Sequence, residues 1–194
     1  MKLLLLLSFS LIASRPQGAI KTAAAPPQKS CIESFKHFRD ALYQNDLEAL
    51  KSFFTFPIMN PSNEVWYLVL DEKELQAKKL EVGQAAPFTE KDFERYYKKL
   101  FPKSFVNRLL KIKSVDLFAS NEAESPALKE GRTAVKLYAS VDENEMVLTL
   151  NLSYSTAWKE KNGEAVDGGE SNVIYTFNML YSGKLHFMNV QLAG

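Results

Sequence analysis

Two aspartates within apolar segments are the residues whose type could support acid–base chemistry. Asp40 lies beside Phe38 and Ala41 in a segment with helical spacing, and Asp116 is followed by Leu117. A carboxylate that faces a tyrosine hydroxyl in an apolar cavity can take a proton from a substrate. Neither aspartate has a spacing that specifies such a pair, and aspartate is mostly solvated in folded proteins. The sequence therefore predicts no catalytic residue, and an enzyme that uses a buried carboxylate and a tyrosine is kept as an alternative.

Metal-binding and nucleophilic patterns are missing from the sequence. Its two histidines, His37 and His186, lack the spacing of helical metal ligands. The G-x-S-x-G turn of serine hydrolases and glycine-rich phosphate loops are absent. The single cysteine, Cys31, excludes an intrachain disulfide. We expect it to be a buried, inert thiol, with an activated thiol or an interchain disulfide as alternatives. No metal and no cofactor are predicted.

Residues 95–113 contain basic side chains and no acid. The basic residues are Arg95, Lys98, Lys99, Lys103, Arg108, Lys111 and Lys113. One interpretation is a surface for an anionic partner. The other is the solvated face of helices whose opposite face is aromatic.

Composition limits the class of protein. The chain has 194 residues, a net charge of +1, 46% hydrophobic residues and 24% charged residues. These values are typical of a single globular domain. The near-neutral charge gives no general reason for binding nucleic acid, and none is predicted.

The N-terminal residues have the pattern of an export signal. Met1 and Lys2 precede an apolar run over residues 3–13, which is too short to span a bilayer. Residues 1–25 are therefore predicted to be a signal peptide and flexible leader, and the protein is expected to be secreted or periplasmic. No stable membrane anchor is predicted.

The remaining residues, 30–194, are expected to form one domain that begins with helices. Ser30 and Glu33 fit a capping box for a helix over residues 30–44, and Asp46 can cap a second, short helix. A third helix follows Thr89, with an expected ion pair between Glu94 and Lys98, and a shorter one covers residues 105–112. Between them, residues 56–59 and 65–70 are predicted to pair as a β-hairpin. Residues 71–87 are predicted to be a loop with about one helical turn.

From residue 115 onward the apolar period changes from 3.6 to 2. Alternating patterns predict strands over residues 135–141, 148–154, 173–179 and 185–192. Residues 162–169 are expected to connect two of them, and Ser182-Gly183 is a two-residue hairpin signal. Helices followed by antiparallel strands predict an α+β fold, with N-terminal helices packed on one face of a curved antiparallel sheet.

Several segments together resemble a known superfamily. They are residues 35–42 (FKHFRDAL), 46–50 (DLEAL), 53–58 (FFTFPI), 88–97 (FTEKDFERYY) and 100–101 (LF). Their order and hydrophobic spacing are similar to those of the nuclear transport factor 2-like superfamily, whose fold is a cystatin-like α+β cone. That superfamily contains ketosteroid isomerase and scytalone dehydratase as well as binding modules and scaffolds, so the resemblance does not fix a function.

The resemblance implies a ligand pocket between the sheet and the helices. Its walls would include Tyr154, Tyr175 and Phe177 on the strands, with Tyr97 opposite them and Trp66 closing the mouth. The alternative for each of these aromatic residues is ordinary core packing.

The leading hypothesis is an exported, non-catalytic binding module that holds a small apolar ligand or a protein partner. One alternative is an isomerase- or dehydratase-type enzyme. The other is an interaction or scaffold domain that forms a homodimer through the outer polar face of its sheet. The residues expected on that face are Thr149, Asn151, Ser153, Thr176 and Asn178.

Overall fold

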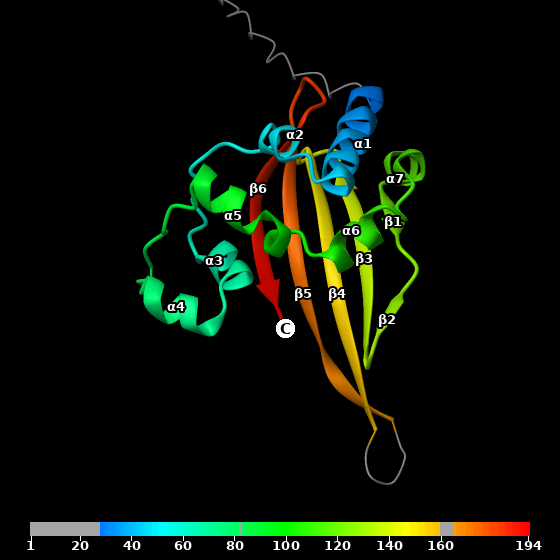
Figure 1. Cartoon of the computed structure of the whole chain (residues 1–194). Coiled ribbons are helices and arrows are strands. Elements are labelled where there is room, and N and C mark those ends of the chain that lie inside the picture. Colours follow the sequence, from blue (N-terminus) through cyan, green and yellow to red (C-terminus); the bar gives the residue numbers. More distant parts are fainter. Residues whose placement is uncertain (1–27, 82, 160–164) are drawn as a thin grey trace, which may run out of the picture.

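The computed structural model describes residues 28–81, 83–159 and 165–194 (Figure 1). Helices form the first part of this described chain and strands form the second, which confirms the predicted α+β class. The predicted signal peptide and leader, residues 1–25, lie outside the described residues. The helices are α1 (Gln28–Gln44), α2 (Leu47–Lys51), α3 (Glu64–Val69), α4 (Glu72–Lys78), α5 (Glu90–Leu100), α6 (Lys103–Leu109) and α7 (Ser114–Ser120). The strands are β1 (Glu122–Glu124), β2 (Leu128–Glu130), β3 (Thr133–Asp142), β4 (Val147–Lys159), β5 (Ala165–Met179) and β6 (Leu185–Ala193).

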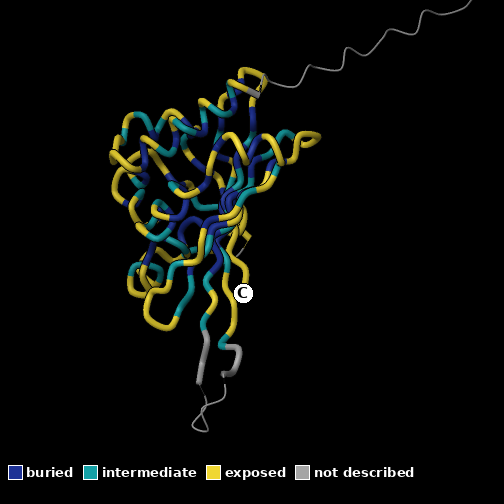
Figure 2. The backbone as a smooth tube through the Cα atoms, turned by 90° about the vertical axis from the view of Figure 1, so that its right-hand side faces the viewer, coloured by how far each residue is buried: buried dark blue, intermediate teal, exposed yellow. Residues whose placement is uncertain are grey.

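The strands form one antiparallel sheet in the order β1-β3-β4-β5-β6, and β2 also pairs with β3. Leu148, Leu150 and Leu152 of β4 are buried on the face that carries the helices. Among the described residues, no helix lies on the other face, and β4 and β5 extend together beyond the helical layer (Figures 1 and 2). The period-2 pattern of the sequence therefore identified the long strands correctly, because one face of each strand is buried.

Two predicted connections differ from the structure. Strand β5 begins at Ala165, so Gly168 and Gly169 lie in the strand and not in a turn. Residues 180–184, and not Ser182-Gly183 alone, connect β5 to β6. The amide of Gly183 donates to the carbonyl of Leu180 at 2.7 Å, which closes this longer turn.

Phenylalanine rings fill the space between the helices and the sheet. Phe38 of α1 is completely buried, and its ring centroid lies 5.2 Å from that of Phe53, 5.7 Å from Phe101 and 5.0 Å from Phe177. Such edge-to-face contacts add to the free energy gained from burying the rings. The helical spacing of α1 is thus explained by the aromatic face that it presents to β5.

Residues 65–69 lie in helix α3 (Glu64–Val69) and not in the predicted hairpin strand over residues 65–70. The side-chain oxygen of Asn60 accepts a hydrogen bond from the amide of Glu64 at 2.8 Å, which supports the first turn of α3. Asn63, with φ 58°, adopts the left-handed conformation just before that helix. Local amide contacts therefore outweigh the β-propensity of the Val-Trp-Tyr-Leu run. Ile58 instead forms an isolated bridge with Phe88.

Other helix boundaries also correct the sequence-based expectations. Helix α1 begins at Gln28, so Ser30 lies inside the helix and does not cap it. Residues 72–78 of the predicted loop form α4, which begins with a capping box between Asp71 and Glu74. Helix α7 occupies residues that were expected to begin the strand-rich half. Its Leu117 and Phe118 are buried, since they follow helical spacing.

The free edge of β6 is covered by segments from the helical half. An uncovered strand edge exposes backbone groups that can pair with another chain. The contacts that cover it are Ser34 Oγ to Leu185 N (2.9 Å), Phe53 O to Phe187 N (2.8 Å), Asn60 Nδ2 to Val190 O (3.0 Å) and Glu64 Oε1 to Leu192 N (3.1 Å). Side chains of α1, of α3 and of the segment between α2 and α3, together with the backbone of Phe53, thus take the place of a neighbouring strand.

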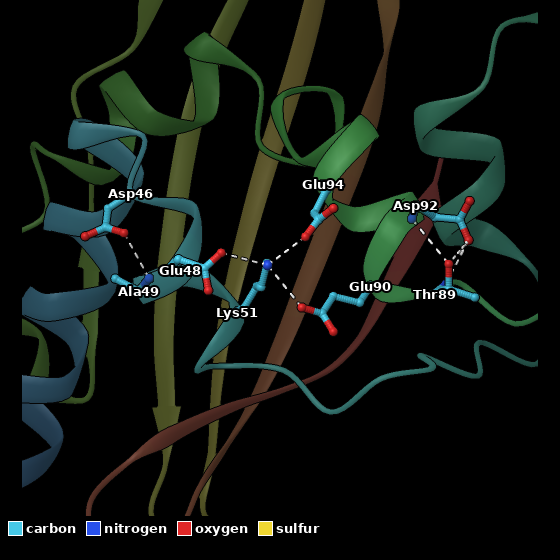
Figure 3. A network of polar contacts seen from close by, with 8 residues as sticks. All are labelled: Asp46, Glu48, Ala49, Lys51, Thr89, Glu90, Asp92 and Glu94. Carbon is cyan, nitrogen blue, oxygen red and sulfur yellow. Dashed lines mark hydrogen bonds and ion pairs between the residues drawn. The ribbon is translucent and has the colours of Figure 1, made fainter.

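Lys51 of α2 pairs with Glu48 of its own helix and with two glutamates of α5, and so joins α2 to α5 (Figure 3). Its Nζ lies 2.8 Å from Glu48, 3.0 Å from Glu90 and 2.7 Å from Glu94. The ion pair expected between Glu94 and Lys98 is therefore replaced by one between Glu94 and Lys51. Hydrogen bonds from Lys51 to Glu48, Glu94 and Glu90 raise the pKa of the ammonium above its ordinary value of 10.5.

Replacing Lys51 by methionine should lower the midpoint of urea denaturation at neutral pH. The variant leaves Glu48, Glu90 and Glu94 without their shared cation, so that the three carboxylates repel one another. The pKa of Lys51 is higher in the folded protein than in the unfolded one. The stabilisation that comes from its charge is therefore fully present below the unfolded-state pKa of 10.5. The difference in midpoint between wild type and Lys51→Met should therefore be constant from about pH 7 to about pH 9. It should shrink as the pH rises above 10.5.

Lys36→Met is the matched control, because it removes an exposed pair between Lys36 and Glu33 (2.9 Å) within one helix. Exposed pairs of this kind contribute little to stability. Circular dichroism in a urea series measures both variants. Equal midpoints for Lys51→Met and Lys36→Met would contradict the assignment of Lys51 as a tie between helices.

Candidate ligand-binding site

The structure separates the aromatic residues that were expected to line one pocket. Tyr175 and Phe177 have no exposed surface, and the hydroxyl of Tyr175 donates to the carbonyl of Leu100 at 2.7 Å. Burial raises the pKa of Tyr175 well above its ordinary value, so this phenol stays neutral and donates. Both side chains belong to the packed core between sheet and helices.

Trp66 and Tyr154 lie at two other places. Trp66 is buried under α4, where its Nε1 donates to the carbonyl of Ala86 at 3.1 Å and the ammonium of Lys78 lies 3.4 Å from its ring centroid. Tyr154 is half-buried on β4, with its hydroxyl 3.4 Å from Oγ of Ser104. Among the residues that were expected to bind a ligand, Tyr97 lines a cavity in the described part of the chain.

This cavity has a volume of about 490 Å³ and lies where the ends of α1 and α5 meet α6. Leu42 and Phe101, both buried, form its apolar floor. Tyr43, Tyr97 and Val106 line its sides, and Tyr43 is 66% exposed. The volume is in the range of small-molecule sites, which extends from about 300 to about 1,000 Å³.

Polar side chains complete the lining. They are Asn45, Lys98, Lys103 and Asn107. Helix α5 buries Phe93, Tyr96 and Leu100 on one face, Tyr97 is half-buried at the border of that face, and Lys98 is exposed. Pro102 separates α5 from α6, which places Lys103 at the first position of the next helix. The α5–α6 corner thus brings both lysines to the same cavity.

The basic stretch over residues 95–113 does not form a single surface. Lys99 pairs with Glu74 at 3.1 Å, and Lys113 lies 3.7 Å from Asp116. Arg108 is buried and donates to the carbonyl of Pro126 at 2.7 Å. Within the described ranges, Arg95, Lys98, Lys103 and Lys111 have no carboxylate within ion-pair distance, whereas Lys99 and Lys113 do. Two of these four unpaired cations, Lys98 and Lys103, line the cavity.

The candidate acid–base residues lie away from the cavity. Asp40 and Asp116 are exposed. In the part of the chain that the structure describes, the buried polar side chains are Asn60, Asn63, Arg108, Ser114, Ser125 and Ser153. None of these buried polar side chains is a carboxylate.

The histidines and the cysteine also lie outside the cavity. His37 packs on Phe53, with ring centroids 5.6 Å apart. Burial and the charge of Lys184 lower the pKa of His186. Cys31 is buried, and desolvation raises the pKa of its thiol, which keeps it protonated. Among the described residues, no group of three or more histidine, cysteine, aspartate or glutamate side chains could hold a metal ion.

The outer face of the sheet bears the residues that were expected to pair two subunits. Thr149 lies opposite Thr176 across β4 and β5, and Asn151 lies opposite Ile174. In the part of the chain that the structure describes, the helices lie on the opposite face (Figure 2). A homodimer through the face stays a prediction.

Comparison of the chain with known protein families, with curated proteins and with solved structures finds no match. None of the helices in the described ranges combines the length and the hydropathy needed to cross a bilayer. Sequence reasoning identified Tyr97 and the basic stretch but missed Leu42, Tyr43 and Val106 as lining residues. The helical spacing predicted the positions of Leu42 and Tyr43 on α1, but it carried no signal that α6 lies beside them.

Proposed function

We propose that this chain is a non-catalytic binding module that holds a small ligand with an apolar body in the cavity between α1, α5 and α6. The observation that carries this proposal is an open cavity with a buried apolar floor, Leu42 and Phe101, and with half-buried Tyr97 and Val106 and exposed Tyr43 at its sides. Ligand sites of this kind are mostly apolar with a few polar groups at fixed positions. The aromatic packing beneath the sheet supports a site at this surface, since rings already fill the interior.

The same proposal includes export and membership of the nuclear transport factor 2-like superfamily. The apolar run over residues 3–13 supports export. Helices followed by antiparallel strands, with the helices on one face of the sheet, support the superfamily. The proposed cavity opens beside the α5–α6 corner and not between Tyr175 and the helices, where the resemblance implied a pocket.

The neutral aromatic probe N-phenyl-1-naphthylamine should bind the folded protein with an increase in its fluorescence. Val106→Phe should weaken this binding by about tenfold or more, because the larger ring occupies part of the cavity and about 1.4 kcal/mol corresponds to a tenfold change. Fluorescence titration of wild type and variant measures both dissociation constants.

Val115→Phe is the matched control, since Val115 is 60% exposed on α7 and does not line the cavity. It adds the same ring at a solvent-exposed position and should leave the dissociation constant unchanged. Absence of saturable binding to wild type, or equal effects of the two variants, would exclude the cavity as the ligand site.

A further inference from the structure

We infer that the ligand of this cavity carries an oxyanion, which Lys98 and Lys103 hold at the rim. This inference rests on the proposed function and names the chemical class of its ligand. The ligand would be an amphipathic acid, with an apolar body against Tyr97 and Val106 and a carboxylate, sulfonate or phosphate group between the two ammonium groups.

The charge of the lining is the first argument. Lys98 and Lys103 both line the cavity, and no aspartate or glutamate does. Within the described residues, neither lysine has a carboxylate within ion-pair distance, whereas nearby Lys99 is neutralised by Glu74 at 3.1 Å. Two uncompensated cations at the mouth of an apolar cavity create a positive potential that attracts anions.

The chain offers a contrasting cavity with the opposite charge. A groove of about 540 Å³ on the outer sheet face is lined by Glu122 and Glu124, and among these described residues Glu124 pairs with Lys136 at 2.7 Å while Glu122 has no ion pair. Positive charge in the proposed site therefore does not reflect a generally basic surface, since the whole chain carries a net charge of only +1. It reflects the position of two lysines on either side of Pro102, at the α5–α6 corner.

The hydrogen-bonding groups of the rim provide the second argument. Asn107 on α6 is exposed, and its amide can donate to an oxyanion beside Lys103. The ammonium of Lys98 lies 5.7 Å from the ring centroid of Tyr97, so the charged and apolar parts of the site are adjacent. Charge-assisted hydrogen bonds of this type are stronger than bonds between neutral groups.

The matched probes are 8-anilinonaphthalene-1-sulfonate and N-phenyl-1-naphthylamine, which share an aromatic body and differ by one sulfonate. At low salt, the sulfonate should bind wild type about tenfold or more tightly than the neutral probe. The variant Lys98→Gln/Lys103→Gln should weaken binding of the sulfonate much more than binding of the neutral probe, so that this difference is abolished. Raising the salt from about 0.05 M to about 0.5 M should weaken binding of the sulfonate alone.

Lys73→Gln/Lys129→Gln is the control, because it removes the same charge from two exposed lysines that do not line the cavity. It should retain the preference for the sulfonate. Co-sedimentation with phosphatidylglycerol and phosphatidylcholine vesicles distinguishes a lipid headgroup from a free acid. Pelleting only with phosphatidylglycerol, lost in Lys98→Gln/Lys103→Gln, identifies the headgroup, and saturable sulfonate binding without pelleting identifies a free acid.

The outcomes separate the two proposals. If both probes bind equally well, or if the two double variants behave alike, the oxyanion inference is overturned while the binding function stands. If neither probe binds the folded protein, the proposed function fails and the inference fails with it.

Discussion

Phe38→Ala should lower the free energy of unfolding by about 3–5 kcal/mol, the usual cost of removing a buried phenylalanine ring. Phe38 is fully buried, with Phe53, Phe101 and Phe177 around it. The loss combines the apolar surface no longer buried with a cavity that rigid neighbouring rings cannot collapse to fill. Urea denaturation monitored by circular dichroism measures the free energy of unfolding of Phe38→Ala and of the wild type.

Tyr43→Ala on the same helix serves as the control, because Tyr43 is 66% exposed. It should change the free energy of unfolding by no more than about 0.5 kcal/mol, as most surface substitutions do. A loss below about 1 kcal/mol for Phe38→Ala, far under the range for packed cores, would mean that the space under the sheet is hollow. The ligand pocket between the sheet and the helices, which the resemblance implied, would then again be the expected binding site.

Gly183→Ala should also strongly destabilise the protein. Gly183 has φ +80°, and a Cβ added there would overlap with Cβ of Ser30 and lie 3.0 Å from its carbonyl carbon. The turn between β5 and β6 therefore packs against the first turn of α1 too closely for any side chain. We expect a cost of about 1–2 kcal/mol for the left-handed conformation and a further ~1–3 kcal/mol for displacing α1.

Gly83→Ala separates these two contributions. Gly83 has φ +81°, nearly the same as Gly183, but a Cβ there would have no neighbour within 4 Å. This variant should show the conformational cost alone. Equal losses of stability for the two variants would show that α1 does not rest on the β5–β6 turn as described.

The long strands could be predicted because their burial follows a local rule. Leu148, Leu150 and Leu152 are buried and alternate with polar residues. This period of two depends only on the strand itself and not on which helices pack on the sheet. Helix α3 could not be predicted in this way. Its residues favour strands, and the contact from Asn60 Oδ1 to Glu64 N that supports the helix is a side-chain interaction outside the apolar pattern.

The candidate site was predictable only in part for a related reason. Tyr97 and Lys98 are neighbours in sequence, so the aromatic and basic pattern of one segment indicated them. The opposite side of the cavity comes from Tyr43 at the end of α1 and Val106 on α6. Their approach depends on how three helices pack, which no single segment encodes.

The covered edge of β6 has a consequence for the order of folding. Ser34 and Leu185 are 151 positions apart, and Asn60 and Val190 are 130 apart. Contacts between such distant positions require closure of large loops, which slows folding. The early helices cannot form their hydrogen bonds to β6 until residues 185–192 have been synthesised. These helices therefore stay without their final packing while the preceding strands are being translated.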